Sequence, residues 1–521
     1  MSPDALARAL ENFLSQARSA FVVEDGQELF DLSLARYSIT ADRGKCLLHL
    51  WSSERNTVRR VLDAESNKDG LVLSVQRFGQ SKPSKLEIIR ERDRRSHSAR
   101  RVERAVFTRQ LERVLKHNFP EWSSSKLSNS VDLEHSFGPI YTRGVLQRGR
   151  SAFAVLAVNR HETQASIDAA LTFGILWLDL CRRNNTRVLV EGLKLIVPRG
   201  HSEVVRARMA NLDHDAAKFQ LYDLEEGELE EVDCHDRGNI ATRLTACVDQ
   251  TAARERFRAP VSTVFELLSR ERASATELKP LSASELSFRL YGLEFARARL
   301  SEAESAQQHE IVFGAGANET VLDGQTSDLF QQLTERLFES RAPGNQNRAD
   351  ALWRMQPERW LESLVVRNVS RLDSQLDSSA VYSQVPAFAA SDRAMIDVLT
   401  CTHEGRLAVL ELKAEEDIHL PLQGLDYWAR VQWHHARAEF QRFGYFAGRQ
   451  LSPQPPLLLL VAPALHLHPT TDTLLRYMSA EIDCTVLGIH ENWREQQKVV
   501  FRKRRESEAR ALSVPAGRMV R

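Results

Sequence analysis

Two short apolar segments joined by a turn constrain the fold of this chain most. Residues 395–413 contain the runs Met-Ile-Asp-Val-Leu-Thr and Leu-Ala-Val-Leu-Glu-Leu-Lys, with a turn around Gly405 between them. Short runs rich in β-branched residues and broken by turn formers predict two adjacent strands in a hairpin. Because side chains alternate between the faces of a strand, Glu411 and Lys413 point the same way. The hairpin can also set Asp397 beside them.

Two carboxylates and a lysine on one face of a strand pair predict a functional site. Burying unpaired charge is costly unless a metal ion or a partner offsets it. Phosphodiester hydrolysis needs charge stabilisation and an activated water, and a divalent cation held by carboxylates supplies both. Asp397 and Glu411 are the candidate ligands of Mg²⁺ or Mn²⁺, with the Leu412 carbonyl as a further candidate. Lys413 would orient or deprotonate the water, or stabilise the transition-state charge.

The spacing of these residues resembles a known signature. Asp397 is followed fourteen residues later by Glu411-Leu-Lys413, which is similar to the D…(D/E)xK motif of the PD-(D/E)xK nucleases. Ile396 stands where that family has a proline before the aspartate. The resemblance covers roughly residues 355–495 and implies the restriction-endonuclease-like α/β fold.

Two flanking segments extend the resemblance. The sequence Pro-Glu-Arg-Trp-Leu-Glu at 357–362 resembles the first core helix of the family, which implies that Glu362 is a metal ligand. The sequence Gln-Gly-Leu-Asp-Tyr at 423–427 matches the QxxxY motif of the RecB-type branch. Gln423 and Tyr427 are four residues apart and share one face of a helix, from which they would brace Lys413 or contact a phosphate.

The resemblance implies a Mg²⁺-dependent hydrolase that cleaves nucleic acid. DNA is the expected substrate, although RNA stays open because the site residues do not read the sugar. A helicase or another repair or defence protein is the expected kind of partner. The alternatives are a surface hairpin with an ordinary Glu–Lys pair, a nucleic-acid-binding or scaffold protein with a vestigial site, and another metal-dependent enzyme on the same fold. The surface hairpin explains neither the Glu362 helix nor the Gln423–Tyr427 pair.

The first half of the chain resembles the second. Residues 154–159 read Ala-Val-Leu-Ala-Val-Asn and align with residues 408–413. In that alignment Glu112 corresponds to Glu362, but the other functional positions differ. Asp397, Glu411, Lys413 and Gln423 correspond to Gly144, Ala157, Asn159 and Ala169. We therefore predict an inert copy kept for packing, pairing or substrate binding, with chance similarity between two α/β units as the alternative.

The length of 521 residues predicts about two to four domains. Both halves have the alternating order of helices and strands that is typical of α/β folds. We predict tandem PD-(D/E)xK domains in an α/β protein, each with a small β-rich module, and a helical linker between the halves. The predicted boundaries are 1–104 (β-rich module with a basic segment), 105–235 (degenerate domain), 236–283 (linker), 284–350 (β-rich module with an amphipathic helix at 327–340), 351–500 (nuclease domain) and 501–521 (basic tail).

Charge and composition limit the partners. Lysines plus arginines and aspartates plus glutamates are both 70, so any nucleic-acid surface must be local. One candidate is the basic run at 90–101, in which Arg94, Arg95, Arg100 and Arg101 would contact phosphates; the alternative is a solvated charged segment. Six cysteines without CxxC spacing indicate reduced thiols, and no apolar run is long enough to span a bilayer. We expect a cytoplasmic protein without a membrane partner, and the sequence leaves its oligomeric state open.

Overall fold

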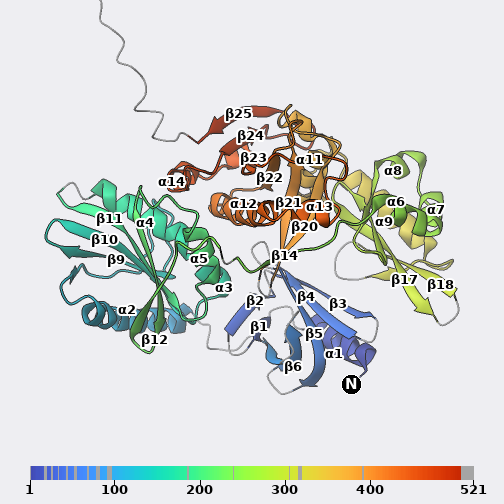
Figure 1. Cartoon of the computed structure of the whole chain (residues 1–521). Helices are drawn as coiled ribbons and strands as arrows, with labels where there is room; N and C mark the ends of the chain where they lie inside the picture. Colours follow the sequence, from blue (N-terminus) through green and yellow to red (C-terminus); the bar gives the residue numbers. More distant parts are fainter. Residues whose placement is uncertain are drawn as a thin grey trace, which may run out of the picture.

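The computed structural model describes residues 2–505 with short gaps, and these residues form a mixed α/β structure with four β-sheets (Figure 1). The α/β class predicted from the sequence is confirmed. The gaps in the described chain are 17–19, 25–26, 33–34, 43–44, 52–55, 67–69, 78–82, 91–96, 185–186, 239, 304–305, 315–318 and 390–391.

The N-terminal module is one helix packed on an antiparallel sheet. Leu6, Leu10 and Leu14 are spaced by four residues, so they share the face of α1 that packs against the sheet. The strand order is β2-β1-β7-β6-β5-β4-β3. The elements are α1 (Pro3–Gln16), β1 (Ala20–Glu24), β2 (Gln27–Asp31), β3 (Arg36–Asp42), β4 (Lys45–Trp51), β5 (Asn56–Ser66), β6 (Gly70–Arg77) and β7 (Ser84–Arg90).

The first α/β unit has a six-stranded sheet between helices. Strand β10 is buried along almost its whole length, since α2 covers one face of the sheet and α4 the other. The strand order is β13-β12-β11-β10-β9-β8. The elements are α2 (His97–Asn118), β8 (Ser123–Ser124), β9 (Tyr141–Arg148), β10 (Ser151–Val158), α3 (Gln164–Asp168), α4 (Ala170–Asn184), β11 (Leu189–Pro198), α5 (Glu203–Met209), β12 (Lys218–Glu225) and β13 (Glu228–Val232).

The second module is an antiparallel five-stranded sheet with four helices, and the helix predicted at 327–340 is confirmed as α9. Gly292 lies in a turn of this sheet and packs closely against Arg359 of the next unit. It has a φ of +76°, and a Cβ atom there would lie 2.0 Å from the Arg359 carbonyl oxygen. The elements are α6 (Gln250–Arg256), α7 (Arg258–Glu266), α8 (Arg270–Ala275), β15 (Thr276–Pro280), β16 (Glu285–Leu290), β17 (Leu293–Ala303), β18 (Ala306–Phe313), β19 (Thr320–Val321) and α9 (Ser327–Ser340).

The second α/β unit contains the predicted hairpin, because β21 pairs antiparallel with β22 and Gly405 turns between them with a φ of +82°. The strand order is β14-β20-β21-β22-β23-β24-β25. The elements are β14 (Thr242–Leu244), α10 (Ala351–Arg354), α11 (Pro357–Arg367), η2 (Val369–Arg371), β20 (Tyr382–Ala389), β21 (Asp392–Cys401), β22 (Leu407–Leu412), α12 (Leu420–Ala436), α13 (Glu439–Arg442), β23 (Leu457–Pro463), η3 (Ala464–His466), α14 (Thr471–Arg476), β24 (Cys484–Ile489) and β25 (Val499–Arg504).

Two predicted boundaries are wrong. The linker at 236–283 is only partly helical, because β14 joins the second α/β sheet and β15 begins the second module. The basic tail does not start at 501, since residues 501–504 complete β25, which pairs with β24. Both errors have the same cause: a short or charged edge strand has no apolar pattern of its own and forms only by pairing with a neighbour.

The two α/β units have the same core topology. In each one an antiparallel hairpin (β9–β10 or β21–β22) is followed by two parallel strands and then an antiparallel edge strand. After the hairpin, the helix that packs on the sheet is α4 in the first unit and α12 in the second. This common topology is what the predicted internal repeat requires.

The two units pack against each other through equivalent elements. Their apolar cores are continuous on the side of α4 and α12. The segments that follow α5 and α14 pair antiparallel, with a bridge between Leu212 and Met478. Asn211 and Asp213 hydrogen-bond to the backbone on either side of Met478, at 2.9 and 2.8 Å. Equivalent segments that contact each other reproduce the geometry of a two-fold interface within one chain.

One described helical stretch has the length and hydropathy of a membrane span. It covers Gln164–Asn184, and 67% of its most apolar part is buried inside the protein. Since α4 packs on β10 and β11, this apolar character is accounted for by the core of the first unit.

Candidate active site

The hairpin brings the two predicted carboxylates together. Leu410 pairs with Val398, so the next residues along the two strands, Glu411 and Asp397, are neighbours. The carboxyl groups are close enough for a hydrogen bond when one carries a proton. The Asp397 Oδ2 atom also accepts a hydrogen bond from the Leu412 amide at 3.1 Å. The structure thus places both predicted ligands at one point of the sheet.

The electrostatics of this pair suit a cation. Burial, followed by the charge of Glu362, raises the pKa of Asp397. Burial, followed by the charge of Asp397, raises the pKa of Glu411 well above its usual range. The Glu411 Oε2 atom is buried and has no hydrogen-bond partner among the described residues. An unsatisfied carboxylate oxygen beside a second carboxylate fits the donor set that a hard divalent cation prefers.

Lys413 completes the predicted triad. Its Nζ atom lies 3.7 Å from Glu411 Oε1 and 3.1 Å from Asp417 Oδ2. Burial alone would lower the pKa of Lys413, but the charges of Glu411 and Asp417 outweigh it and raise the pKa. Lys413 is therefore held as a cation. Asp417 was missed in the sequence, although its position four residues after Lys413 was a usable signal.

Glu362 lies near the pair but binds other partners. It is buried on α11, and the Gln384 amide donates to Glu362 Oε2 at 2.7 Å and to Asp397 Oδ1 at 3.3 Å. Glu362 also pairs with Arg359 at 2.9 Å and with Lys279 at 3.5 Å. Burial would raise the pKa of Glu362, but Lys279 and Arg359 lower it. Lys279 comes from β15, so no local sequence signal could have connected it to the site.

On α12, Tyr427 of the predicted QxxxY pair lies near the carboxylates. Gly424 lets this helix approach the sheet, because a Cβ atom there would lie 2.5 Å from the Leu460 side chain and 3.5 Å from Glu411 Cβ. Burial, followed by the charges of Glu411 and Asp397, raises the pKa of Tyr427 well above its usual range. The Gln423 Oε1 atom is buried without a hydrogen-bond partner among the described residues.

The first unit lacks the triad, but the residues that replace it differ from those predicted. Ala157 faces α2, on the opposite side of the sheet from α4. In the first unit, Leu156 pairs with Leu195, and Leu195 packs against α4. In the second unit, Glu411 pairs with Leu460, and Leu460 packs against α12. Leu156 and Glu411 thus have equivalent neighbours. The strand alignment is therefore wrong by one residue, and Leu156 takes the place of Glu411.

The position of Asp397 is taken in the first unit by a cation. Arg143 pairs with Leu156. The residue that corresponds to Asp397 is therefore Arg143, and not Gly144 as predicted. Its guanidinium lies 4.3 Å from the Phe137 ring and 5.7 Å from the Trp177 ring. Trp177 lies three residues after the glycine that packs on the sheet, as Tyr427 does in α12. An arginine, an aromatic ring and an aliphatic side chain thus stand where the second unit has Asp397, Tyr427 and Glu411.

The predicted basic surface is only partly described. Arg94 and Arg95 lie outside the described residues, whereas Arg100 and Arg101 belong to the first turn and a half of α2. The arginines and lysine of β25 are paired with acids: Arg502 with Asp373, Lys503 with Asp472 and Arg504 with Asp483.

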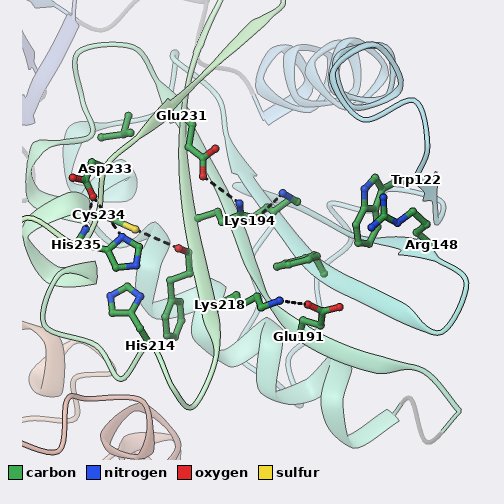
Figure 2. A pocket seen from close by; sticks show the side chains of 14 residues that line it. Trp122, Arg148, Glu191, Lys194, His214, Lys218, Glu231, Asp233, Cys234 and His235 are labelled. Carbon is green, nitrogen blue, oxygen red and sulfur yellow. Dashed lines mark hydrogen bonds and ion pairs between the residues drawn. The ribbon is translucent and has the colours of Figure 1, made fainter.

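A cavity of about 740 Å³ lies in the first unit (Figure 2). Lys194 projects beside it, 4.4 Å from the Phe119 ring and 4.8 Å from the Phe153 ring, and burial lowers its pKa to about 8. Lys218 and Glu191 pair across its rim at 2.6 Å. None of the predicted site residues lines this cavity, so the site is defined by side-chain chemistry and not by the volume of a pocket.

The Glu411→Gln variant tests the electrostatics of the metal-free site. A carboxyl whose pKa is raised on folding contributes stability that is complete below its unfolded pKa, about 4.3, and is lost as the pH rises toward the folded value. Glutamine does not titrate. In EDTA we expect the variant to melt above the wild type at pH 8, by about 2–4 °C for each kcal/mol relieved, and to show no such gain at pH 4.5. An equal gain at both pH values would show that Glu411 is not the titrating group.

Comparisons with known proteins add no family to this geometry. No protein-family model matches the chain, and the search of curated proteins gives no match. Among the described residues no three histidine, cysteine, aspartate or glutamate side chains are grouped as metal ligands. The candidate site is therefore a pair of buried carboxylates with an adjacent lysine.

Proposed function

We propose that the second α/β unit is a divalent-metal-dependent phosphodiesterase that cleaves DNA. The observation that carries the proposal is the convergence of Asp397, Glu411 and Lys413 on one face of the β21–β22 hairpin. An ordinary core does not call for two neighbouring buried carboxylates, one of which has an oxygen without a hydrogen-bond partner among the described residues. The resemblance to the PD-(D/E)xK nucleases supports the same reading.

Asp397 and Glu411 would hold Mg²⁺ or Mn²⁺, which supplies charge stabilisation on the phosphate and lowers the pKa of water. The remaining ligands would be backbone oxygen, water or substrate. Glu362 could join them only by releasing Arg359 or Lys279. We therefore assign Glu362 first to holding these two cations beside the site.

The roles of the other side chains follow from their charge. Lys413 stays protonated beside Asp417 and is suited to stabilise negative charge on the phosphate rather than to remove a proton. Tyr427 keeps its proton next to the carboxylates and can donate a hydrogen bond. Gln423 can use its unsatisfied amide oxygen to orient the attacking water.

The purified full chain should be incubated with single- and double-stranded DNA and RNA in Mg²⁺, Mn²⁺ or EDTA. We expect cleavage of DNA with either metal and none in EDTA. Binding of nucleic acid without cleavage in either metal would favour the scaffold alternative, in which the site is vestigial. Cleavage that persists in EDTA would contradict the metal-dependent mechanism.

A further inference from the structure

A chain of polar contacts runs from the first α/β unit to Lys413. Thr172 on α4 is fully buried, and its Oγ1 atom lies 3.1 Å from Nδ1 of His419 in the second unit. The His419 amide donates a hydrogen bond to Asp417 Oδ1 at 2.7 Å. The other oxygen of Asp417 pairs with Lys413 Nζ at 3.1 Å. Phe173 also packs edge-on against the His419 ring, with 5.7 Å between the ring centroids.

A second contact reaches the helix that carries Tyr427. Arg208 on α5 donates to Asp426 Oδ2 through Nε at 3.0 Å and through Nη2 at 2.8 Å. Its third nitrogen, Nη1, donates to the Asp168 carbonyl at 2.6 Å. Both charged side chains are largely buried, with 9% and 14% of their surfaces exposed. Arg208 therefore fixes α12 at the residue next to Tyr427.

These contacts hold the segment between β22 and α12, which contains Lys413 and Asp417. The segment 413–419 between β22 and α12 has no regular secondary structure. A lysine side chain has about 2 kcal/mol of rotamer entropy to lose when it is held in one position. Asp417 can hold Lys413 only if the segment itself is fixed, and Thr172 with Phe173 packs against its last residue.

We propose that the inert first unit activates the second, because it positions Lys413 through Thr172, His419 and Asp417. The inference rests on the proposed role of Lys413 in phosphodiester cleavage. Thr172, His419 and Asp417 are positioning residues, since only Lys413 would touch the substrate. The first unit can therefore contribute to the activity without acidic residues of its own, because it positions Lys413 in the second unit.

The first test separates positioning from binding. Thr172→Val removes the hydroxyl at nearly constant volume, and Thr172→Ser keeps it. A small displacement of a catalytic group can lower the rate by about 10²-fold. We expect Thr172→Val to lower kcat by about 10-fold or more with little change in KM, and Thr172→Ser to restore most of the rate. Arg476→Gln, which removes the ion pair with Asp179 across the same interface, is the matched control and should leave kcat unchanged.

The second test does not depend on cleavage. Amine acetylation of the metal-free protein, followed by mass spectrometry, measures how tightly Lys413 is held. We expect several-fold faster acetylation of Lys413 in Thr172→Val than in the wild type, Thr172→Ser or Arg476→Gln. His419→Phe keeps a ring against Phe173 but lacks Nδ1, and it should behave like Thr172→Val; this variant decides the matter if Thr172→Val does not fold.

The outcomes distinguish this inference from the proposed function. If the wild type cleaves nothing but Lys413 is acetylated faster in the variants, the phosphodiesterase proposal fails and the positioning chain stands. Acetylation of Lys413 at the wild-type rate in both Thr172→Val and His419→Phe would overturn the inference. An equal loss of kcat in Arg476→Gln would also overturn it, because the interface as a whole and not the Thr172 contact would then be responsible.

Discussion

Replacement of Asp397 or Lys413 by alanine is expected to abolish Mg²⁺-dependent cleavage while the protein still folds. Asp397→Ala removes one of two predicted metal ligands, and Lys413→Ala removes the only predicted catalytic cation of the triad. Loss of one electrostatic donor at a phosphoryl or acyl centre lowers kcat by about 10²–10³-fold. Cleavage assays under single-turnover conditions measure the loss for each variant.

The melting temperature provides a second readout for the same variants. Asp397→Ala should melt above the metal-free wild type, because it removes the charge that repels Glu411. Glu404→Ala in the exposed turn of the same hairpin is the control, and we expect no change in rate or melting temperature. Undiminished cleavage by both the Asp397 and the Lys413 variants would place the activity elsewhere in the chain.

Replacement of Arg341 by methionine is expected to lower the free energy of unfolding by about 2–4 kcal/mol, the cost of leaving several carbonyls without donors. Arg341 is fully buried and donates to the carbonyls of Tyr291, Leu352 and Met355 at 2.7–2.8 Å. Its guanidinium lies 4.3 Å from the Trp360 ring. These contacts connect the second module to α10 and α11.

Urea unfolding measures the effect on stability. Arg336→Met is the matched control, since Arg336 is exposed on α9, the helix that Arg341 directly follows, and its loss should change stability by less than about 0.5 kcal/mol. Because β15 of the second module supplies Lys279, we also expect Arg341→Met to impair cleavage. Stability equal to that of the control variant would contradict the role of Arg341 as the connection between the module and α11.

The sequence predicted the local elements of the site well, because each had a strong pattern of its own. Gly405 between two apolar runs specified the hairpin, and the α12 helix follows as expected. Asp397, Glu411 and Lys413 came together because the side-chain period of two residues and the hairpin pairing fix their positions. Tyr427 reaches them because Gly424 allows close packing of the helix.

Features that depend on long-range packing could not be predicted. Lys279 reaches the site from a strand 83 residues before Glu362 in the chain, and Thr172 reaches His419 from the other unit. The alignment of the two units matched identical letters in β10 and β22, but a shift of one residue moves a side chain to the other face of the sheet. Because of that shift, the sequence alignment placed Gly144 instead of Arg143 at the position of Asp397.

The most direct test of the central claim is the location of Mn²⁺ in crystals soaked with this ion. Anomalous scattering identifies Mn²⁺ independently of any activity. The account predicts a peak within coordination distance of the carboxylates of Asp397 and Glu411, and none beside Arg143 and Leu156 in the first unit. Absence of a peak at Asp397 and Glu411 in crystals of a protein that cleaves DNA with Mn²⁺, or a peak bound only by other residues, would contradict it.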